Sequence, residues 1–200
     1  MNEEKFNYEL VDWDKLQSLT KILAKKIKES KYEPDIIVGI SKGGWAIARL
    51  LCDYIDGKDI IGLDAKQLEI HKQVSLSSVN INLLEKKVLV VDDIMNRKSL
   101  DRAIEHMASL KPDKIKTLAL FYIKGTTKPD YHAEKISYKL VVFPWNFVDS
   151  IRKIIYNNLD EYREMNVERI KSRLKQSFNI DVEEEVIEET LKTFTIQNIL

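Results

Sequence analysis

The 200-residue chain has one cysteine, three histidines, six glycines, four prolines and no excess of charge of either sign. Cys52 has no partner for an internal disulfide, so we expect a small buried hydrophobe in a reducing, cytoplasmic environment. The 32 basic residues balance the 32 acidic residues, which removes the general electrostatic argument for a nucleic-acid partner. The three histidines lack the spacing of metal ligands, so no transition-metal site is predicted.

The sequence also lacks a long apolar run. No segment approaches the roughly 18 consecutive apolar residues of a transmembrane helix. The charged N-terminus, MNEEKFNYEL, has no apolar core of the kind found in signal peptides. We therefore predict a cytoplasmic protein without membrane contact. With 44% hydrophobic residues, the chain is long enough for one sizeable core, or for one core with a small appendage.

Strand-like and helix-like segments alternate from residue 13 to residue 145. The run DIIVGI is short, apolar and β-branched, which is typical of a strand buried on both faces of a parallel sheet. Strands that alternate with helices predict an α/β fold with a parallel sheet and helices on both faces. The predicted strands are 35–40, 59–66, 86–94, 114–124 and 138–145, and the predicted helices are 13–31, 45–55 and 99–110.

From Asn146 onward the composition changes to helical periodicity. Three segments, 149–166, 167–178 and 181–194, predict helices, and Asp181 and Glu184 are spaced like a capping box. We predict one domain at 1–149 and a helical C-terminal extension at 150–200. The extension is either an element for dimerisation or partner binding, or a cap over the core. Segment 67–82 is polar and weakly alternating, and is predicted to be either a hairpin or a flap beside the site.

The turn Ser41-Lys42-Gly43-Gly44 separates a predicted strand from a predicted helix. Consecutive glycines let backbone N–H groups face an anion at the helix N-terminus, and Lys42 adds a positive charge. This pattern is typical of phosphate binding. The alternative is a glycine turn needed only for close packing between strand and helix.

Asp92 and Asp93 follow Val91 at the predicted end of a second strand. Adjacent residues of a strand point in opposite directions, so these carboxylates would share one ion only if the strand has already ended. At a strand terminus they can accept hydrogen bonds from vicinal hydroxyls or hold a hydrated Mg²⁺. The alternative is that one aspartate caps the following helix while the other is solvated.

Three motifs together resemble a known family. VLVVDDIMNRKSL resembles the phosphoribosyl-binding motif of type I phosphoribosyltransferases, ISKGG resembles their pyrophosphate loop, and VVFPWNF resembles a strand and turn of the xanthine-guanine type. The resemblance covers residues 31–149. It implies a Rossmann-like parallel-sheet fold and transfer of a 5-phosphoribosyl group from phosphoribosyl pyrophosphate to a 6-oxopurine base, with Mg²⁺ as cofactor. The implied partners are phosphoribosyl pyrophosphate and a purine-type base or nucleotide, and we expect a homo-oligomer.

The resemblance assigns roles to individual residues. Asp92 and Asp93 would bind the ribose hydroxyls and Mg²⁺, directly or through water, and Asn96 stands at the third catalytic position. The pyrophosphate would be held by Ser41, Lys42, Gly43, Gly44 and Lys66. The 5′-phosphate would be enclosed by Asn96, Arg97, Lys98 and Ser99. The base would be bordered by Leu140, Val141, Val142 and Trp145, although Trp145 is equally a candidate for packing within the turn.

The sequence departs from this family in the second loop and near the base. DDIMNRKSL is one residue shorter than the usual loop and has no glycine, and Asn96 replaces a carboxylate. An amide cannot act as a general base near neutral pH. Leu140 replaces a stacking aromatic residue, and Asn146 replaces an acidic residue. These departures leave open an alternative function, a catalytically impaired protein that binds phosphoribosyl pyrophosphate or a nucleotide as a regulatory signal.

Overall fold

The computed structural model describes residues 8–40, 42–56, 59–64, 82–95, 97–137, 140–162 and 164–197. The chain forms two compact units. One consists of residues 13–138, and the other combines residues 1–12 with residues 139–200. Each unit has its own sheet and its own hydrophobic core.

A five-stranded parallel sheet forms the centre of the unit made by residues 13–138. Its strands lie in the order β3 (Asp59–Leu63), β2 (Ile36–Ile40), β4 (Lys87–Met95), β5 (Lys114–Ile123) and β6 (Tyr131–Ile136). All four neighbouring pairs are parallel. Every residue of β2 is buried, as expected for an apolar run covered on both faces. The predicted α/β class with a parallel sheet is therefore confirmed.

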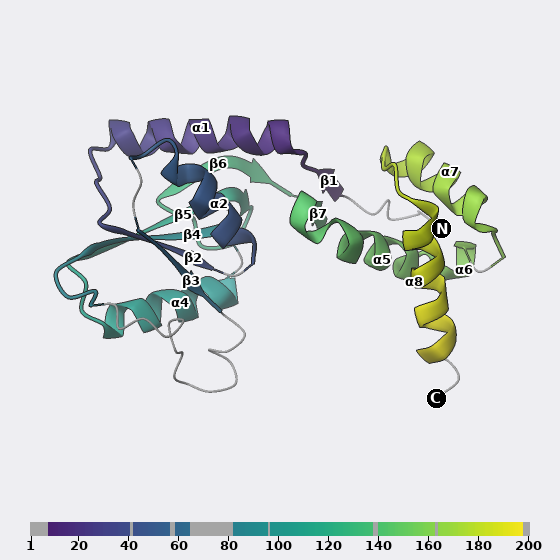
Figure 1. The fold of residues 1–200 in the computed structure, drawn as a ribbon. Helices are drawn as coiled ribbons and strands as arrows, with labels where there is room; N and C mark the ends of the chain where they lie inside the picture. The colour runs from purple at the N-terminus through teal and green to yellow at the C-terminus, as the bar shows by residue number, and fades with distance from the viewer. Residues whose placement is uncertain are drawn as a thin grey trace. The chain divides into compact units, whose positions relative to one another are not determined.

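Helices cover both faces of this sheet. Helices α1 (Trp13–Glu29) and α2 (Gly43–Cys52) lie on one face, and α4 (Arg97–Ser109) lies on the other (Figure 1). The buried residues of α1 recur at helical spacing and are Leu16, Leu19, Thr20, Leu23, Ala24 and Ile27. On the opposite face, Val88 and Val90 of β4 pack in one cluster with Leu100, Ala103 and Met107 of α4. Helices thus cover both faces of the sheet (Figure 1), which directs the search for a ligand site to the ends of its strands.

The chain reverses its direction of travel across the sheet between β2 and β4. From β2 it passes to β3 on one side, and from β4 it passes to β5 and then β6 on the other. In open α/β sheets, ligands bind beyond the carboxyl ends of the strands at such a reversal. The topology therefore directs attention to the residues that follow β2 and β4.

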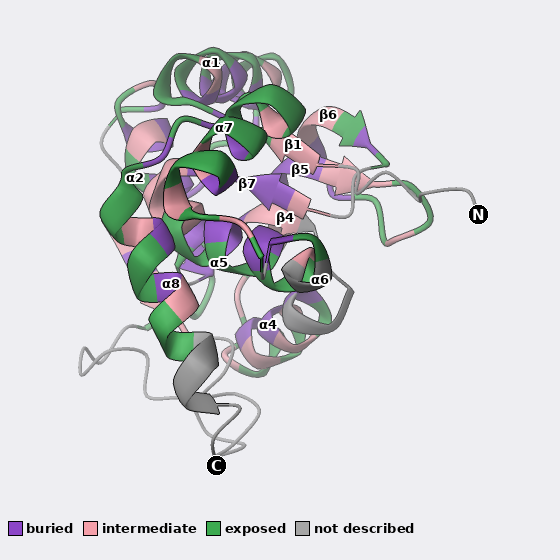
Figure 2. Ribbon diagram, turned by 90° about the vertical axis from the view of Figure 1, so that its right-hand side faces the viewer, coloured by how far each residue is buried: buried purple, intermediate pink, exposed green. Residues whose placement is uncertain are grey.

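The second unit joins a small sheet to helices. Strand β1 (Tyr8–Leu10) pairs in parallel with β7 (Leu140–Val142). A 3-10 turn, η1 (Pro144–Asn146), leads into helices α5 (Phe147–Asn157), α6 (Leu159–Tyr162), α7 (Val167–Phe178) and α8 (Glu184–Gln197). Each of the helices α5, α7 and α8 has both buried and exposed residues (Figure 2). Their buried sides meet, together with Tyr162 of α6, in a cluster that includes Ile154, Ile170, Leu174 and Ile187. The predicted helical C-terminal region is present.

Several element predictions need correction. The sequence patterns missed β1, which is only three residues long, and the edge strand β6, whose sequence YHAEKI alternates weakly. The predicted helix 149–166 is interrupted, because α5 ends at Asn157 and a new short helix begins at Leu159. The side-chain amide of Asn158 donates a hydrogen bond to the Ile154 carbonyl over 2.7 Å, which satisfies a terminal carbonyl of α5.

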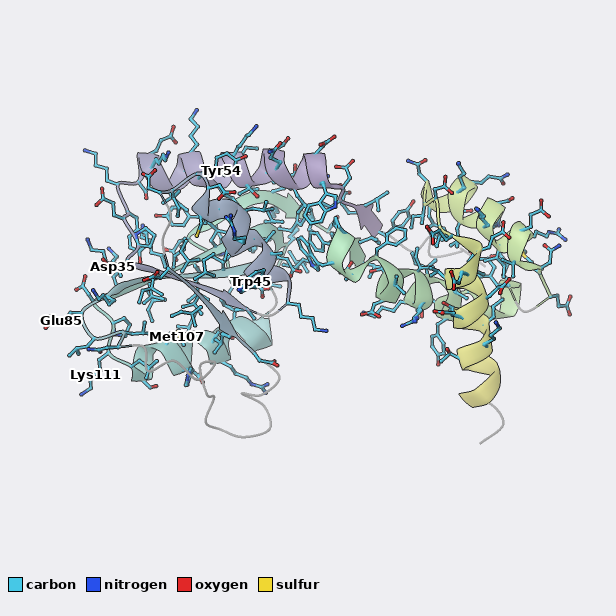
Figure 3. The ribbon with its side chains drawn as sticks, viewed as in Figure 1. Asp35, Trp45, Tyr54, Glu85, Met107 and Lys111 are labelled. Atoms are coloured by element: carbon cyan, nitrogen blue, oxygen red, sulfur yellow. The ribbon has the colours of Figure 1, made fainter. Side chains whose placement is uncertain are left out.

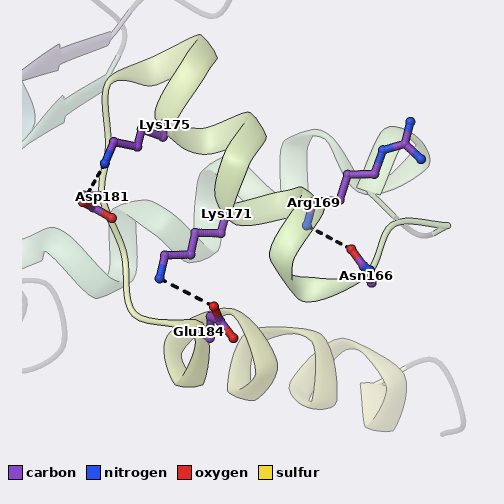
Figure 4. Close-up of polar contacts among 6 residues, drawn as sticks. All are labelled: Asn166, Arg169, Lys171, Lys175, Asp181 and Glu184. Carbon is purple, nitrogen blue, oxygen red and sulfur yellow. Dashed lines mark hydrogen bonds and ion pairs between the residues drawn. The ribbon is translucent and has the colours of Figure 1, made fainter.

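The predicted capping box at Asp181 and Glu184 is wrong. Helix α8 begins at Glu184, and the Asp181 carboxylate instead accepts a hydrogen bond from Lys175 Nζ over 3.0 Å (Figure 4). The carboxylate of Glu184 lies 3.6 Å from Lys171 Nζ (Figure 4). Both acidic residues therefore pair with basic residues of the preceding helix. Tertiary ion pairing has replaced the local capping that their spacing indicates.

The division into compact units falls between residues 12 and 13 and between residues 138 and 139. It differs from the predicted domain boundary at 149/150, which stays a prediction. The predicted flap at 67–82 lies outside the described residues except for Asn82. Within the part of the chain that the structure describes, no helix is both long enough and apolar enough to cross a membrane.

Candidate functional site

The glycine turn after β2 starts helix α2 directly. Lys42 occupies the N-cap position, and its side chain makes no capping hydrogen bond. Gly43 and Gly44 form the first turn of the helix and are both buried. The first N–H groups of a helix have no partners within it, so this end of α2 offers donors and a partial positive charge to an anion. Ser41 lies outside the described residues.

The two predicted motifs are in direct contact. A methyl group added at Gly44 would collide with the Val91 carbonyl oxygen and would lie 3.0 Å from Asp92 Cα. A methyl group added at Gly43 would collide with the Asp93 carboxylate. Because neither glycine has a side chain, the first turn of α2 can pack against the backbone of β4. The two predicted roles of the glycine turn, phosphate binding and close packing between strand and helix, are therefore compatible. Close packing is what brings the Lys-Gly-Gly turn to the paired aspartates.

A third glycine belongs to this packing and was not predicted. A methyl group at Gly39 of β2 would lie 2.6 Å from Trp45 Cα and 2.8 Å from Trp45 N. The available signal was a glycine inside an otherwise β-branched strand, which often marks the close approach of another backbone.

Trp45 marks the end of the sheet at which α2 begins, and this residue is 49% exposed. Asp35, Glu85 and Lys111 lie at the opposite end of the sheet (Figure 3).

The paired aspartates lie within β4, whose extent agrees with the predicted strand at 86–94, and they do not follow the end of that strand. β4 pairs with β2 only as far as Val91 but continues beside β5 to Met95, which faces Tyr122. The carboxylate Oδ1 of Asp92 accepts the Asp93 N–H over 2.9 Å, and Oδ1 of Asp93 accepts the Ile94 N–H over 2.8 Å. Both carboxylates thus lie beyond the last residue pair between β2 and β4, and each accepts the N–H of the residue that follows it.

Strand alternation directs the two carboxylates to different neighbours. Asp92 shares its side of β4 with Val88 and Val90, which pack toward α4, whereas Asp93 points toward the start of α2. The side chain of Asp92 is only 7% exposed. Burial and the negative charge of Asp93 raise the pKa of the Asp92 carboxyl well above its ordinary value.

This donor set fits a magnesium ion. Carboxylate oxygens are the hard ligands that Mg²⁺ prefers, and Mg²⁺ usually keeps several waters and needs only one or two carboxylates. Burial and the charge of Asp93 disfavour the ionised form of Asp92, and a bound divalent cation would favour that form. No group of three or more potential metal-ligating His, Cys, Asp or Glu residues occurs among the described residues, so any ion here would depend on these two and on its other ligands.

The predicted 5′-phosphate residues fall at the start of α4. Arg97 is the first residue of this helix, and Lys98 and Ser99 follow in its first turn, two residues earlier than the predicted helix start. Their side chains, together with Asn96 and Lys66, lie outside what the structure describes. The backbone nevertheless provides a second helix N-terminus after β4, a type of position that binds phosphate elsewhere.

The predicted base-contacting residues lie in the other unit. Leu140, Val141 and Val142 form β7, and Trp145 belongs to η1. The Trp145 ring stacks on Phe143 with centroids 4.7 Å apart and an interplanar angle of 12°, so one of its faces packs within the turn. Their role toward a base stays a prediction.

Asn146 has a local explanation. Its side-chain oxygen accepts the Phe143 N–H over 2.7 Å and the Ser150 hydroxyl over 3.1 Å, and its amide nitrogen lies 3.4 Å from the Val141 carbonyl oxygen. An ionised carboxylate has no hydrogen to donate and could make only the first two of these bonds. The amide therefore joins the end of β7 to the start of α5.

Comparison with known proteins identifies a family match. A family model of the phosphoribosyl transferase domain matches residues 9–151. The transcriptional regulator GfcR of Methanococcus maripaludis is 26% identical over 117 residues, which cover 52% of this chain and 56% of the regulator. The chain thus spans about half the length of the curated relatives it matches.

Solved structures share the fold. A purine phosphoribosyltransferase from Pyrococcus horikoshii OT3 is similar with a TM-score of 0.61 and 28% identity, over 69% of this chain and 93% of that chain. A xanthine-guanine-hypoxanthine phosphoribosyltransferase from Helicobacter pylori has a TM-score of 0.56 at 18% identity, over 74% of this chain and 99% of that one. At that identity, the second similarity concerns the fold alone.

Proposed function

This chain belongs to the phosphoribosyl transferase domain family, and from that premise we propose that it transfers the 5-phosphoribosyl group of phosphoribosyl pyrophosphate to a purine-type base, a 6-oxopurine, with release of pyrophosphate. The similarity to a purine phosphoribosyltransferase along 93% of that chain supports this substrate class.

One observation carries the proposal. The Lys42-Gly43-Gly44 turn packs against Asp92 and Asp93, at the point where the chain reverses direction across the sheet. A helix N-terminus with a lysine suits a pyrophosphate, and two carboxylates suit vicinal hydroxyls and a divalent cation. Phosphoribosyl pyrophosphate carries these groups on adjacent atoms of one ribose. The contact between the two motifs matches the short spacing of the groups on this molecule.

The proposed roles follow from that arrangement. The N–H groups of α2, with Ser41, Lys42 and Lys66, would hold the pyrophosphate. Asp92 and Asp93 would accept hydrogen bonds from the ribose hydroxyls and would hold Mg²⁺, directly or through water. The metal, when bound, supplies positive charge that stabilises the leaving pyrophosphate. The start of α4, with Asn96, Arg97, Lys98 and Ser99, would bind the 5′-phosphate.

In the proposed reaction, the bond between the anomeric carbon and a pyrophosphate oxygen breaks, and a bond from that carbon to a ring nitrogen of the base forms. Both bonding electrons leave with pyrophosphate. Lys42 and the α2 N–H groups would stabilise the charge that develops there. The proton lost by the base nitrogen passes to solvent or pyrophosphate, because the amide of Asn96 cannot accept it. Leu140, Val141, Val142 and Trp145 remain our candidates for bordering the base.

The test is release of pyrophosphate from phosphoribosyl pyrophosphate and Mg²⁺ with a panel of bases. Lys42→Gln should lower kcat/KM for phosphoribosyl pyrophosphate by about tenfold or more, since a charged donor at the leaving group is lost. The matched control is Lys86→Gln, because Lys86 is exposed and precedes β4 at the opposite end of the sheet. It should leave kcat/KM unchanged. Absence of pyrophosphate release with every base would rule out the transferase proposal.

A second candidate is a regulatory protein that binds phosphoribosyl pyrophosphate or a nucleotide without turnover. The similarity of half the chain to the transcriptional regulator GfcR favours it, as do Asn96 and the glycine-free loop. This candidate predicts calorimetric binding of phosphoribosyl pyrophosphate together with no product from any base. Replacing the loop MNRKS by a glycine-containing loop of the usual length should then increase transfer. A wild-type protein that turns over at an ordinary enzymatic rate would exclude this candidate.

A further inference from the structure

We propose that α7 carries a second binding site, which takes the phosphate group of a small phosphate monoester. The site is a pocket of about 440 Å³ beside α6 and α7. Its lining residues are Glu161, Met165, Arg169, Ser172, Arg173 and Gln176. All six belong to the unit formed by residues 1–12 and 139–200, so this site is separate from the Lys-Gly-Gly turn and the paired aspartates and does not rest on the proposed function.

The guanidinium of Arg169 is the group in this pocket that is most available to a ligand. The other three basic residues of α7 each pair with an acidic residue, and the pairs are Lys171–Glu184, Arg173–Glu161 and Lys175–Asp181. The Arg169 side chain extends away from the first and the third of these pairs (Figure 4). Within the part of the chain that the structure describes, its guanidinium makes no ion pair and no hydrogen bond. Arg169 therefore offers a full positive charge and all its donors to an anion.

Arg169 also stands where a basic residue is unfavourable for the helix itself. It lies in the first turn of α7, where the helix dipole favours acidic side chains and disfavours basic ones. It stands four residues before Arg173, so two like charges are neighbours on one face of the helix. The adjacent Glu168 does not offset this repulsion, because consecutive residues of a helix do not face each other. An anion bound between the two guanidiniums would relieve both effects, and a residue that departs from local preferences in this way often marks a functional position.

The side chains of α7, and not its N-terminal end, would bind the anion. Asn166 caps the helix, and its side-chain oxygen accepts the Arg169 N–H over 2.9 Å (Figure 4). The Arg173 Nε donates to Glu161 Oε1 over 2.8 Å, which fixes the orientation of this guanidinium. Its two terminal nitrogens make no hydrogen bond within the described residues and remain as donors.

The other donors of the pocket favour a phosphate group over a carboxylate. Ser172 and Gln176 lie three and seven residues after Arg169, which places them on the same face of α7. Neither side chain has a hydrogen-bond partner among the residues that the structure describes. A phosphate monoester presents three acceptor oxygens, and a guanidinium binds two of them at once. Two guanidiniums, a hydroxyl and an amide supply more donors than the two oxygens of a carboxylate require.

The size and charge of the pocket restrict the ligand further. A volume of about 440 Å³ is in the range of sites for small organic molecules, and Met165 offers an apolar contact for the organic part. Two arginines and Glu161 give the pocket a formal charge of +1, which suits one phosphate and not a chain of them. Exposed acidic residues crowd the neighbouring α8 and the turn before it, and these are Glu183, Glu184, Glu185, Glu188 and Glu189. An extended polyanion such as nucleic acid would therefore meet no continuous basic stripe.

The experiment titrates the full chain with phenyl phosphate and follows the backbone amides of α7 by NMR. The wild type should show saturable shifts at Ser172 and Arg173. Arg169→Gln should weaken the affinity by about tenfold or more, because a charge-assisted bidentate contact is lost. The matched control is Lys153→Gln, since Lys153 is an exposed basic residue of α5 that has no ion pair within the described residues and does not line the pocket. Its affinity should stay within about twofold of the wild type.

Thermal unfolding in phosphate-free buffer distinguishes a binding role of Arg169 from a structural one. Arg169→Gln should melt at the same temperature as the wild type or at a higher one, because a like-charge pair is removed. A lower melting temperature would show that Arg169 stabilises the fold and would overturn the proposal. Wild-type protein without saturable shifts in α7 would also overturn it, as would equal weakening by Lys153→Gln, or shifts caused by a DNA duplex and not by phenyl phosphate. Pyrophosphate release, which tests the proposed function, is a separate measurement and does not change with any of these outcomes.

Discussion

At the scale of single residues, three glycines position this site because they have no Cβ. Gly39, Gly43 and Gly44 each leave room for a backbone or carboxylate group that a Cβ would strike. None of these three needs a positive φ, so their value here is steric and not conformational. Gly62 of β3 differs, because a Cβ there would make only an ordinary contact of 3.6 Å with Trp45 Cδ1.

This difference predicts unequal costs for the same substitution. Gly44→Ala should lower the free energy of unfolding by about 1–3 kcal/mol, because the new methyl group would have to push α2 away from β4. Gly62→Ala should change it by less than about 1 kcal/mol, since its methyl group has space. Urea denaturation of both variants measures the two values. Equal effects would show that the contact between α2 and β4 is not as close as described.

His132 illustrates how one residue affects the pH dependence of stability. Burial, followed by the positive charges of Lys26, Lys128 and Lys135, lowers the pKa of the His132 imidazole below its ordinary value of 6.5. The unfolded chain therefore binds a proton at this residue more readily than the folded chain does. Well above pH 6.5, His132 is neutral in both the folded and the unfolded chain and does not affect the free energy of unfolding. As the pH drops through 6.5 toward the lower pKa of the folded state, the unfolded chain takes up the proton first, so the free energy of unfolding falls.

We predict that the free energy of unfolding of His132→Gln falls less than that of the wild type between about pH 7.5 and about pH 5.5. These two values lie on either side of the ordinary histidine pKa. Glutamine retains polarity but cannot take up the proton. Urea denaturation at both pH values gives the two differences. A wild type and variant with the same pH dependence would show that His132 does not titrate differently in the folded state.

At the scale of elements, the C-terminal end of α7 depends on a left-handed residue. Asn179 has φ 51° and ψ 31°, and its N–H donates to the Lys175 carbonyl over 3.0 Å. The next N–H, from Ile180, donates to the Leu174 carbonyl over 3.3 Å, and the Ile180 side chain is buried in the helical core. The Asn179 bond is the one that defines the αL motif, in which a left-handed residue ends the helix.

The left-handed conformation predicts opposite signs for two substitutions. Asn179→Gly should raise the free energy of unfolding or leave it unchanged, because glycine adopts a positive φ without steric cost. Asn179→Ala should lower it by about 1 kcal/mol, because a Cβ without a compensating polar group disfavours this conformation. Thermal unfolding of both variants tests the prediction. If alanine proved more stabilising than glycine, the end of α7 would not be left-handed.

At the scale of the whole molecule, the two compact units have separate cores. The cluster between the sheet and α4 lies entirely within residues 13–138, and the cluster among α5 to α8 lies entirely within residues 139–200. A defect in one core should therefore weaken that unit first. Leu174 of α7 is completely buried in the helical cluster and is suited to this test.

Leu174→Ala should cost about 2–5 kcal/mol through the cavity it creates. Hydrogen exchange should then accelerate in α5, α7 and α8, while amides of β2 and β4 keep their protection, because local opening follows the cooperative unit that is weakened. Val90→Ala is the reciprocal variant, since Val90 is completely buried in the sheet cluster. An equal loss of protection in both units for either variant would show that they unfold as one.

Much of the sheet could be predicted from sequence, because its buried strands are continuous apolar runs. The predictions of β2, β4 and β5 came from such runs. Strands at an edge or in a two-stranded sheet have fewer buried faces, so β1 and β6 carried too weak a pattern to be recognised. The extent of β4 agrees with the predicted strand at 86–94. The sequence could not show that β5 continues to pair with β4 after the pairing with β2 has ended, because no local pattern in VVDDIM indicates how far a partner strand extends.

The sequence by itself determined which chemical groups this protein places after its strands: a lysine with two glycines after one, and two aspartates in another. It determined them because strand, turn and helix propensities are local. Only the tertiary structure decided that Asp93 meets Gly43 while Asp92 lies on the α4 side of the strand. The physical reason is that such contacts depend on the crossing of α2 over β4, which glycines permit, and on how far β5 extends the strand beyond β2.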